Sequence, residues 1–158
     1  RRMSDAGYVS PFTDDLVAFP DGAVLLRRVP PDFIDWAQLD HEGNPRITSG
    51  AFQDYSAKKA LEDFGLPGAC MSVVDLAILE REGIQPSDLL AGFGPRHGFA
   101  ALSAEALRDC HQGIQSDPRP GEPWHAVVFA KTKPKRDNTM KSCIAEAARW
   151  YVPPSARL

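Results

Sequence analysis

One histidine stands at a position where a side chain could do chemistry. His125 opens the segment "HAVVFAK", and Glu122 precedes it by three residues. Imidazole titrates near neutral pH, so a histidine at the mouth of a strand suits general acid–base catalysis, with Glu122 as a companion acid. The alternative is a structural histidine that caps the edge of a sheet through one hydrogen bond, which is the commoner role for such a residue. His125 and Glu122 are therefore candidate catalytic residues, and both roles stay open.

Two further segments could bind an anionic ligand. Arg27 and Arg28 end an apolar run, and alternation along a strand turns one of them, which we take to be Arg28, toward a cleft or the interior. A half-buried arginine needs an anion, either an internal carboxylate or a ligand phosphate. The segment "RITSGAFQD" adds Arg46 and the hydroxyl of Ser49, next to a glycine that lets a ligand approach the backbone. A plain turn would use the same residues.

Taken in chain order, these residues resemble the layout of ADP-ribosyltransferase-like folds. In that family an arginine on an early strand binds nicotinamide dinucleotide, a strand with serine and threonine follows, and a late strand begins with a catalytic acid. Arg28, Ser49, and Glu122 or His125 take these places here. The resemblance implies a nucleotide-using transferase with an arginine–serine–histidine cleft and NAD as its cofactor. The residues by themselves indicate no cofactor.

Charge and composition limit the classes of partner. The formal net charge is −3 at pH 7, so no general attraction to nucleic acid or to an anionic membrane follows. One local segment, "KTKPKR", is basic, and it could contact a phosphate backbone or an acidic protein, or form a solvated loop. Its cations are Lys131, Lys133, Lys135 and Arg136. No apolar run approaches the roughly 20 residues that span a bilayer. We expect a protein partner and no membrane contact.

The three cysteines predict neither a metal site nor a disulfide framework. Cys70, Cys110 and Cys143 are widely spaced, without a CxxC or Cys/His pattern, and each lies in an apolar stretch. Such cysteines usually act as small buried hydrophobes, so we expect all three in the core. Unpaired cysteines, and first residues that lack the apolar stretch of a signal peptide, predict a reducing compartment, the cytoplasm.

Strand and helix signals are mixed along the chain without a regular alternation. Strand-like runs cover 23–29, 70–74, the start of 99–110 and 125–131, with a shorter extended piece at 46–52. Helical signals run from Ser56 to Gly65, from Asp75 to Gly83, over 85–94, from Ser103 to Cys110, and from Asn138, as the cap, through Tyr151. The last of these has an apolar stripe formed by Met140, Cys143, Ile144, Ala147 and Tyr151.

This pattern favours an α+β fold with one domain. We expect a small, mostly antiparallel sheet packed with several helices, and the C-terminal helix on the sheet. Residues 1–13 are polar and interrupted by proline and glycine, so they are expected to be a flexible N-terminal segment. Residues 14–158 then form the single globular domain.

No catalytic motif of recognised spacing occurs, since the chain lacks a Walker A loop, GxGxxG, HExxH and GxSxG. The leading hypothesis is a small cytosolic binding protein, an accessory component of a larger bacterial multi-protein system. The alternatives are the nucleotide-using transferase and an effector or toxin that acts on nucleic acid. Convergence of Arg28, Ser49 and His125 on one pocket would favour the transferase, and their separation would count against it.

Overall fold

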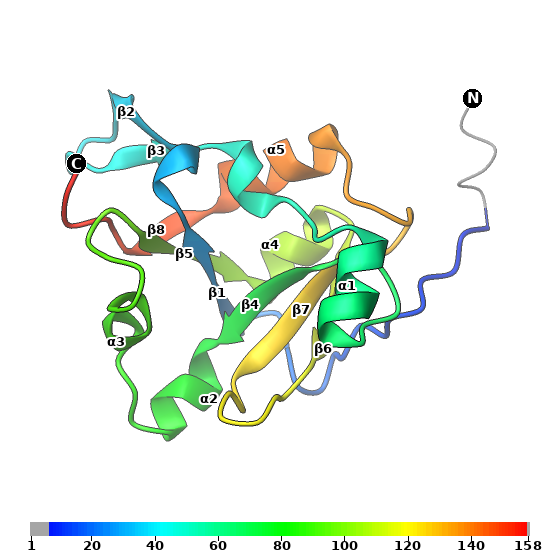
Figure 1. Cartoon of the computed structure of the whole chain (residues 1–158). Coiled ribbons are helices and arrows are strands. Elements are labelled where there is room, and N and C mark those ends of the chain that lie inside the picture. The colour runs from blue at the N-terminus through cyan, green and yellow to red at the C-terminus, as the bar shows by residue number, and fades with distance from the viewer. Residues whose placement is uncertain (1–6, 158) are drawn as a thin grey trace.

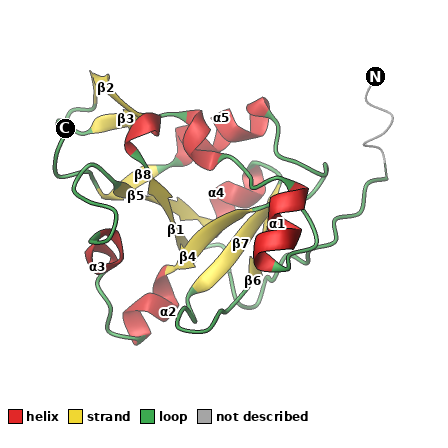
Figure 2. Cartoon of the chain, in the orientation of Figure 1, coloured by secondary structure: helices red, strands yellow, loops and turns green. Residues whose placement is uncertain are grey.

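A six-stranded antiparallel sheet forms the centre of the protein (Figures 1 and 2). The computed structural model describes residues 7–157. Across the sheet the strands are β6 (Gln112–Ser116), β7 (His125–Ala130), β4 (Met71–Asp75), β1 (Val24–Val29), β5 (Gly98–Ser103) and β8 (Arg149–Val152). A separate two-stranded sheet pairs β2 (Ile34–Leu39) with β3 (Pro45–Ile47). The architecture is the single α+β domain with a mostly antiparallel sheet that the sequence predicts.

Helices connect the strands and cover both faces of the sheet (Figure 2). The α-helices of the described range are α1 (Ala57–Phe64), α2 (Leu76–Arg81), α3 (Pro86–Leu90), α4 (Ala104–Asp109) and α5 (Asn138–Ala147), and two 3₁₀ turns are η2 (Pro31–Phe33) and η3 (Ser49–Phe52). The predicted caps Ser56 and Ser103 are confirmed, because their hydroxyl oxygens accept backbone hydrogen bonds at 3.1 and 3.0 Å. Gly65 ends α1 with a left-handed φ of 65°, a conformation that favours glycine.

Residues of the central strands alternate between two apolar layers. On one face Leu25 and Val128 belong to the main core, to which α4 and α5 contribute. Ile144 of α5 is 1% exposed in this core, so the C-terminal helix lies on the sheet as predicted. On the other face one small cluster forms between α1 and Val127, and another between α2, α3 and Leu26. The second face is therefore covered at two sides, and its middle lies between α1 and α3 (Figure 1).

The C-terminal helix is shorter than the sequence predicts. Its apolar stripe was expected to reach Tyr151, but α5 ends before that residue and β8 follows at once. Trp150 and Tyr151 extend the sheet instead, because β5 offers an edge with which β8 pairs. Tyr151 is 46% exposed and so does not belong to the buried helix face. The cap is also one residue earlier than expected: the side chain of Asp137, rather than Asn138, accepts the Met140 amide at 2.8 Å.

Three strands carry too weak a pattern to be predicted. β2 and β6 read "IDWAQL" and "QGIQS", in which polar residues break the apolar alternation, and β8 looks like the end of a helix. The extended piece expected at 46–52 is strand only as far as Ile47, and its second half is the 3₁₀ turn η3. Each of these segments takes its conformation from tertiary contacts more than from its own residues.

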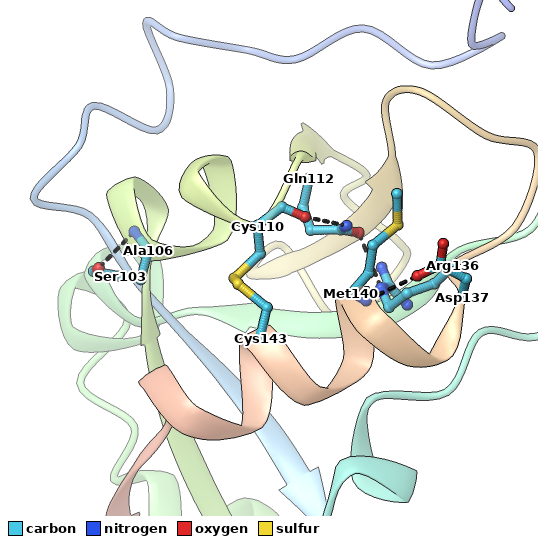
Figure 3. Close-up of a disulfide and its surroundings, with 8 residues drawn as sticks. All are labelled: Ser103, Ala106, Cys110, Gln112, Arg136, Asp137, Met140 and Cys143. Carbon is cyan, nitrogen blue, oxygen red and sulfur yellow. Dashed lines mark hydrogen bonds between the residues drawn. A yellow bond between two sulfur atoms is a disulfide. The ribbon is translucent and has the colours of Figure 1, made fainter. Parts of the chain in front are cut away.

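Cys110 and Cys143 form a disulfide that joins the end of α4 to α5 (Figure 3). The expectation that they are unpaired is therefore wrong. The two cysteines are 33 positions apart in the sequence, and they come together because α4 and α5 lie on the same face of the sheet, which brings the two Cα atoms to 5.8 Å. Cys70 is buried and free, as predicted. Burial raises the pKa of the Cys70 thiol to about 12, so this thiol is protonated at neutral pH.

The N-terminal part of the described chain contacts the sheet. Residues 1–6 of the segment expected to be flexible lie outside the described residues. Phe12, from the same segment, is buried and stacks on Phe129 with ring centroids 5.0 Å apart, and the Thr13 amide donates to Gln115 at 2.8 Å. Contacts with β6 and β7 thus begin before residue 14. Among residues 7–157, none of the helices combines the length and the apolar character needed to cross a membrane.

Candidate functional site

The middle of the second sheet face holds a cavity of about 440 Å³. Its floor comes from β1, β4 and β7, and residues of α1 and of the segment that begins with α3 form its sides. Aromatic rings make up part of the wall. The polar side chains of the wall are those of Arg27, Arg28, Ser72, Arg119, Glu122 and His125. The combination of a hydroxyl, an imidazole and several guanidinium groups in one concave site marks it as the candidate functional site.

Ser72 and His125 meet in this cavity because of the strand register. β4 and β7 pair so that Val74 lies opposite His125 and Ser72 lies opposite Val127. Ser72 and His125 are therefore diagonal neighbours on one face of the sheet. Ser72 Oγ lies 3.0 Å from His125 Nε2, and His125 Nδ1 lies 3.0 Å from Asp117 Oδ2. Ser72 and His125 share a hydrogen bond, and the Asp117 carboxylate contacts the other side of the ring, whose Nδ1 donates to the Asp117 backbone carbonyl. The three side chains thus follow each other in the order that serine hydrolases use.

The surroundings of His125 Nδ1 decide which ring nitrogen carries the proton in the neutral imidazole. The backbone carbonyl and the carboxylate oxygen of Asp117 both lie 3.0 Å from Nδ1, and both are acceptors. Nδ1 therefore carries the hydrogen, and Nε2 keeps its lone pair. The Ser72 hydroxyl then donates to Nε2, which is the arrangement in which a base can take the proton of a serine nucleophile. His125 is thus engaged through both nitrogens and is more than a one-bond cap on the sheet edge.

The loop between β6 and β7 holds Asp117 in place. The Asp117 amide donates to the carbonyl of His125 at 3.0 Å, and Arg119 Nε donates to Asp117 Oδ2 at 2.8 Å. Backbone hydrogen bonds between Arg119 and Glu122 close the loop. Glu122 lines the cavity as well, but the carboxylate that contacts the His125 ring is that of Asp117. Sequence reasoning missed Asp117, which lies in a loop without a motif.

Two arginines bring positive charge to the cavity without a carboxylate partner. Arg27 donates to the carbonyl of Ser72 at 2.9 Å and to two other backbone carbonyls, at the point where β1 and β4 stop pairing. Arg28 Nη1 lies 3.1 Å from His97 Nδ1, and its guanidinium carbon lies 4.0 Å from the centre of the Phe93 ring. Within residues 7–157 neither guanidinium forms an ion pair. Burial lowers the pKa of Arg27 to about 10, so Arg27 stays charged at neutral pH.

The structure brings only part of the predicted site together. Arg28, Glu122 and His125 line the cavity described above. Ser49 and Arg46 line a different cavity, of about 630 Å³, between the β2–β3 hairpin, α5 and β8. The arginine–serine–histidine cleft that the family resemblance implies is therefore not formed with Ser49. A different serine, Ser72, occupies that place. Its only signal in the sequence is a polar residue in the apolar strand "MSVVD".

The basic segment after β7 is largely neutralised by acidic neighbours. Arg136 is 3% exposed and pairs with Asp54, whose side chain is also buried. Arg136 is thus not available for the nucleic-acid contact that the basic segment could make, because a buried guanidinium cannot reach a phosphate backbone. Lys131 and Lys133 form ion pairs with aspartates at 3.7 and 2.7 Å. The contribution of this segment to any nucleic-acid contact is smaller than its sequence indicates.

No protein-family model, no curated protein and no solved structure matches this chain. Its function is therefore argued from the chemistry of the cavity itself.

Proposed function

We propose that the protein is a serine hydrolase that cleaves carboxylic esters in the cavity between α1 and α3. The observation that carries this proposal is the row of contacts through Ser72, His125 and Asp117: a 3.0 Å hydrogen bond between Ser72 Oγ and His125 Nε2, and the Asp117 carboxylate 3.0 Å from His125 Nδ1. A serine hydroxyl next to a base that a carboxylate orients is the arrangement that nucleophilic acyl transfer requires. The role of each side chain follows from its place in this chain.

The reaction would run in two halves. His125 Nε2 accepts the hydroxyl proton while Ser72 Oγ attacks the carbonyl carbon of the ester. The bond to the alcohol oxygen breaks, His125 returns the proton to that oxygen, and the acyl group stays on Ser72. Water then attacks the acyl carbon and gives a proton to His125, which passes it to Ser72 Oγ as the acid leaves. Asp117 keeps the ring in the required tautomer, and the charge of Arg27 favours the developing oxyanion.

Hydrolysis of 4-nitrophenyl hexanoate tests the proposal. Ser72→Ala removes the nucleophile, and each of Ser72→Ala and His125→Gln should lower kcat/KM by at least about 100-fold. Ser49→Ala is the matched control, because it removes a half-buried serine from the other cavity and should leave the rate unchanged. A Ser72→Ala protein with full activity would overturn the proposal.

The melting temperature of His125→Gln separates a catalytic from a structural histidine. Glutamine keeps a hydrogen-bonding group at this position, but its amide does not titrate near neutral pH. A catalytic His125 predicts loss of activity at a nearly unchanged melting temperature. Parallel loss of stability and activity would instead assign His125 the structural role.

The other functional hypotheses stay predictions. An accessory role in a larger bacterial multi-protein system and an effector role on nucleic acid draw no specific support from the cavity. The hypothesis of an NAD-dependent transferase gains some support, because Arg28 and His125 line the same cavity. Its expected serine, Ser49, lines the other cavity. The hydrolase proposal accounts for Ser72 and Asp117, which none of these hypotheses uses.

The cellular compartment is a separate part of the proposal. The disulfide between Cys110 and Cys143 supports an oxidising compartment, since disulfides rarely persist in the cytosol. The cytoplasmic location expected from the sequence stays a prediction. Acid quenching of the cells, followed by alkylation of the thiols in urea, distinguishes the two: one alkylated and two protected cysteines support the oxidising compartment, and three alkylated cysteines support the cytoplasm.

A further inference from the structure

The cavity of the proposed hydrolase site has an excess of positive charge. Arg27, Arg28 and Arg119 line it, and Glu122 is the acidic residue of its wall within the described range. The charge of Arg119 is offset by its ion pair with Asp117 at 2.8 Å. Arg27 and Arg28 have no such partner in residues 7–157. Two positive charges thus face one negative charge, so the cavity favours a ligand that carries negative charge.

Arg28 has hydrogen-bond donors left for a ligand. Within the part of the chain that the structure describes, its one side-chain hydrogen bond joins Nη1 to His97 Nδ1 at 3.1 Å. His97 Nδ1 must be the acceptor, because guanidinium nitrogens only donate. A guanidinium carries five N–H groups, so those on Nε and Nη2 remain. They form the planar fork that binds an oxyanion through two parallel hydrogen bonds.

Phe93 and His97 hold this guanidinium at the cavity wall before any ligand arrives. The Arg28 guanidinium carbon lies 4.0 Å from the centre of the Phe93 ring, and the Phe93 and His97 rings lie 5.5 Å apart. A side chain that is already positioned loses less conformational entropy when it binds. Phe93 is 52% exposed, so a ligand on Arg28 would also cover apolar surface that the fold leaves open.

We propose that the substrate is an ester that carries an oxyanion, a carboxylate or a phosphate, on an apolar or aromatic body, and that Arg28 binds this oxyanion. The inference rests on the proposed hydrolase function and names its substrate class. The rings of Tyr55, Phe64 and Trp124 in the same wall suit the apolar body. Arg28 then determines specificity, while Ser72 carries out the chemistry.

A matched pair of esters tests this specificity. 4-Nitrophenyl hexanoate and mono-4-nitrophenyl adipate have the same leaving group and acyl chain length, and they differ in a terminal methyl against a carboxylate. The KM of the wild-type protein should be at least about tenfold lower for the adipate, because a hydrogen-bonded ion pair stabilises its complex. Arg28→Gln should remove this preference by raising the adipate KM, with kcat and the hexanoate kinetics unchanged.

Two further variants keep the test clear. Arg28→Lys retains the charge but loses the fork, so it should keep part of the preference for the adipate. Arg46→Gln removes an exposed arginine from the other cavity, and this variant should keep the full preference for the adipate. Equal losses for both esters in Arg28→Gln would mean that Arg28 serves the fold, and the inference would fail.

Binding measurements separate this inference from the hydrolase proposal. Calorimetric titration of the Ser72→Ala protein with benzoate, phenyl phosphate and benzyl alcohol measures recognition without turnover. At least one of the two anions should bind more tightly than the alcohol and lose its advantage when Arg28→Gln is added, and the tighter anion identifies carboxylate or phosphate. If the anions bind in this way but no ester is cleaved, anion recognition stands and the hydrolase falls. If neither anion binds better than benzyl alcohol, anion recognition by Arg28 is refuted.

Discussion

Reduction of the disulfide should remove a large part of the stability of the protein. Cys110 and Cys143 are 33 residues apart in the sequence. In the chain-entropy account, a closed loop of this length lowers the entropy of the unfolded chain by about 12.5 cal/mol/K, so reduction should lower the free energy of unfolding by about 3.7 kcal/mol at 25 °C. For a domain of this size each kcal/mol shifts the melting temperature by about 2–4 °C, which gives a fall of about 7–15 °C.

Urea denaturation of the oxidised protein and of the protein reduced with dithiothreitol measures this loss. The Cys110→Ala/Cys143→Ala double variant should show no response to the reductant, which confirms that the reductant acts through this bond. Thiol titration gives an independent count: in urea the oxidised protein should expose one thiol, Cys70, and the reduced protein three. In the native protein Cys70 should be unreactive, because burial raises its pKa to about 12.

Either of two results would refute this reasoning. Three reactive thiols in the oxidised protein would show that the bond does not form. A loss below about 1 kcal/mol on reduction would show that the loop between α4 and α5 is already restricted in the unfolded chain, so that the entropic account does not apply.

Three other perturbations test the packing and electrostatics of the fold. Ile144→Asp should unfold the domain, as circular dichroism would show, because Ile144 is 1% exposed and a carboxylate there would lack a partner; an unchanged melting temperature would mean that this face of α5 is open. Asp54→Asn should lower the free energy of unfolding by about 3–5 kcal/mol, because it leaves the buried guanidinium of Arg136 without its carboxylate. Urea denaturation measures this loss, and an unchanged free energy of unfolding would contradict the role of this ion pair. Stability should also fall as the pH drops below about 6.5, the ordinary pKa of histidine. Burial and neighbouring arginines, Arg28 among them, hold the pKa of His97 below that value, so the unfolded chain takes up the proton first; His97→Asn should flatten this dependence.

The parts of the fold that could be predicted are those whose signals are local. β7 alternates along its own length, and Ser56 and Ser103 precede residues with good helix propensity, so strand and caps follow from neighbours in the sequence. The end of α5 does not, because Trp150 and Tyr151 fit either a helical stripe or an edge strand. The edge of β5 decides between them, and the sequence contains no local trace of that edge.

The site could be predicted only in part for the same reason. His125 and Arg28 stand out because each is a polar residue at the end of an apolar run. Ser72 lies more than 50 residues before His125, and only the register of β4 on β7 brings the two side chains to 3.0 Å. Asp117 reaches the imidazole through a loop whose conformation has no motif. Ser49, next to a glycine, has a stronger local signal than Ser72 but lines another cavity.

Covalent labelling of Ser72 tests the central claim most directly. A fluorophosphonate reacts rapidly with a serine only where a neighbouring base activates its hydroxyl. We predict that intact-protein mass spectrometry of the wild type shows a single adduct and that peptide mapping places it on Ser72. Ser72→Ala and His125→Gln should remain unlabelled while still folded, and Ser49→Ala should label like the wild type. An adduct on Ser49, equal labelling of His125→Gln, or no adduct on the folded wild-type protein would contradict the assignment of Ser72 as the nucleophile.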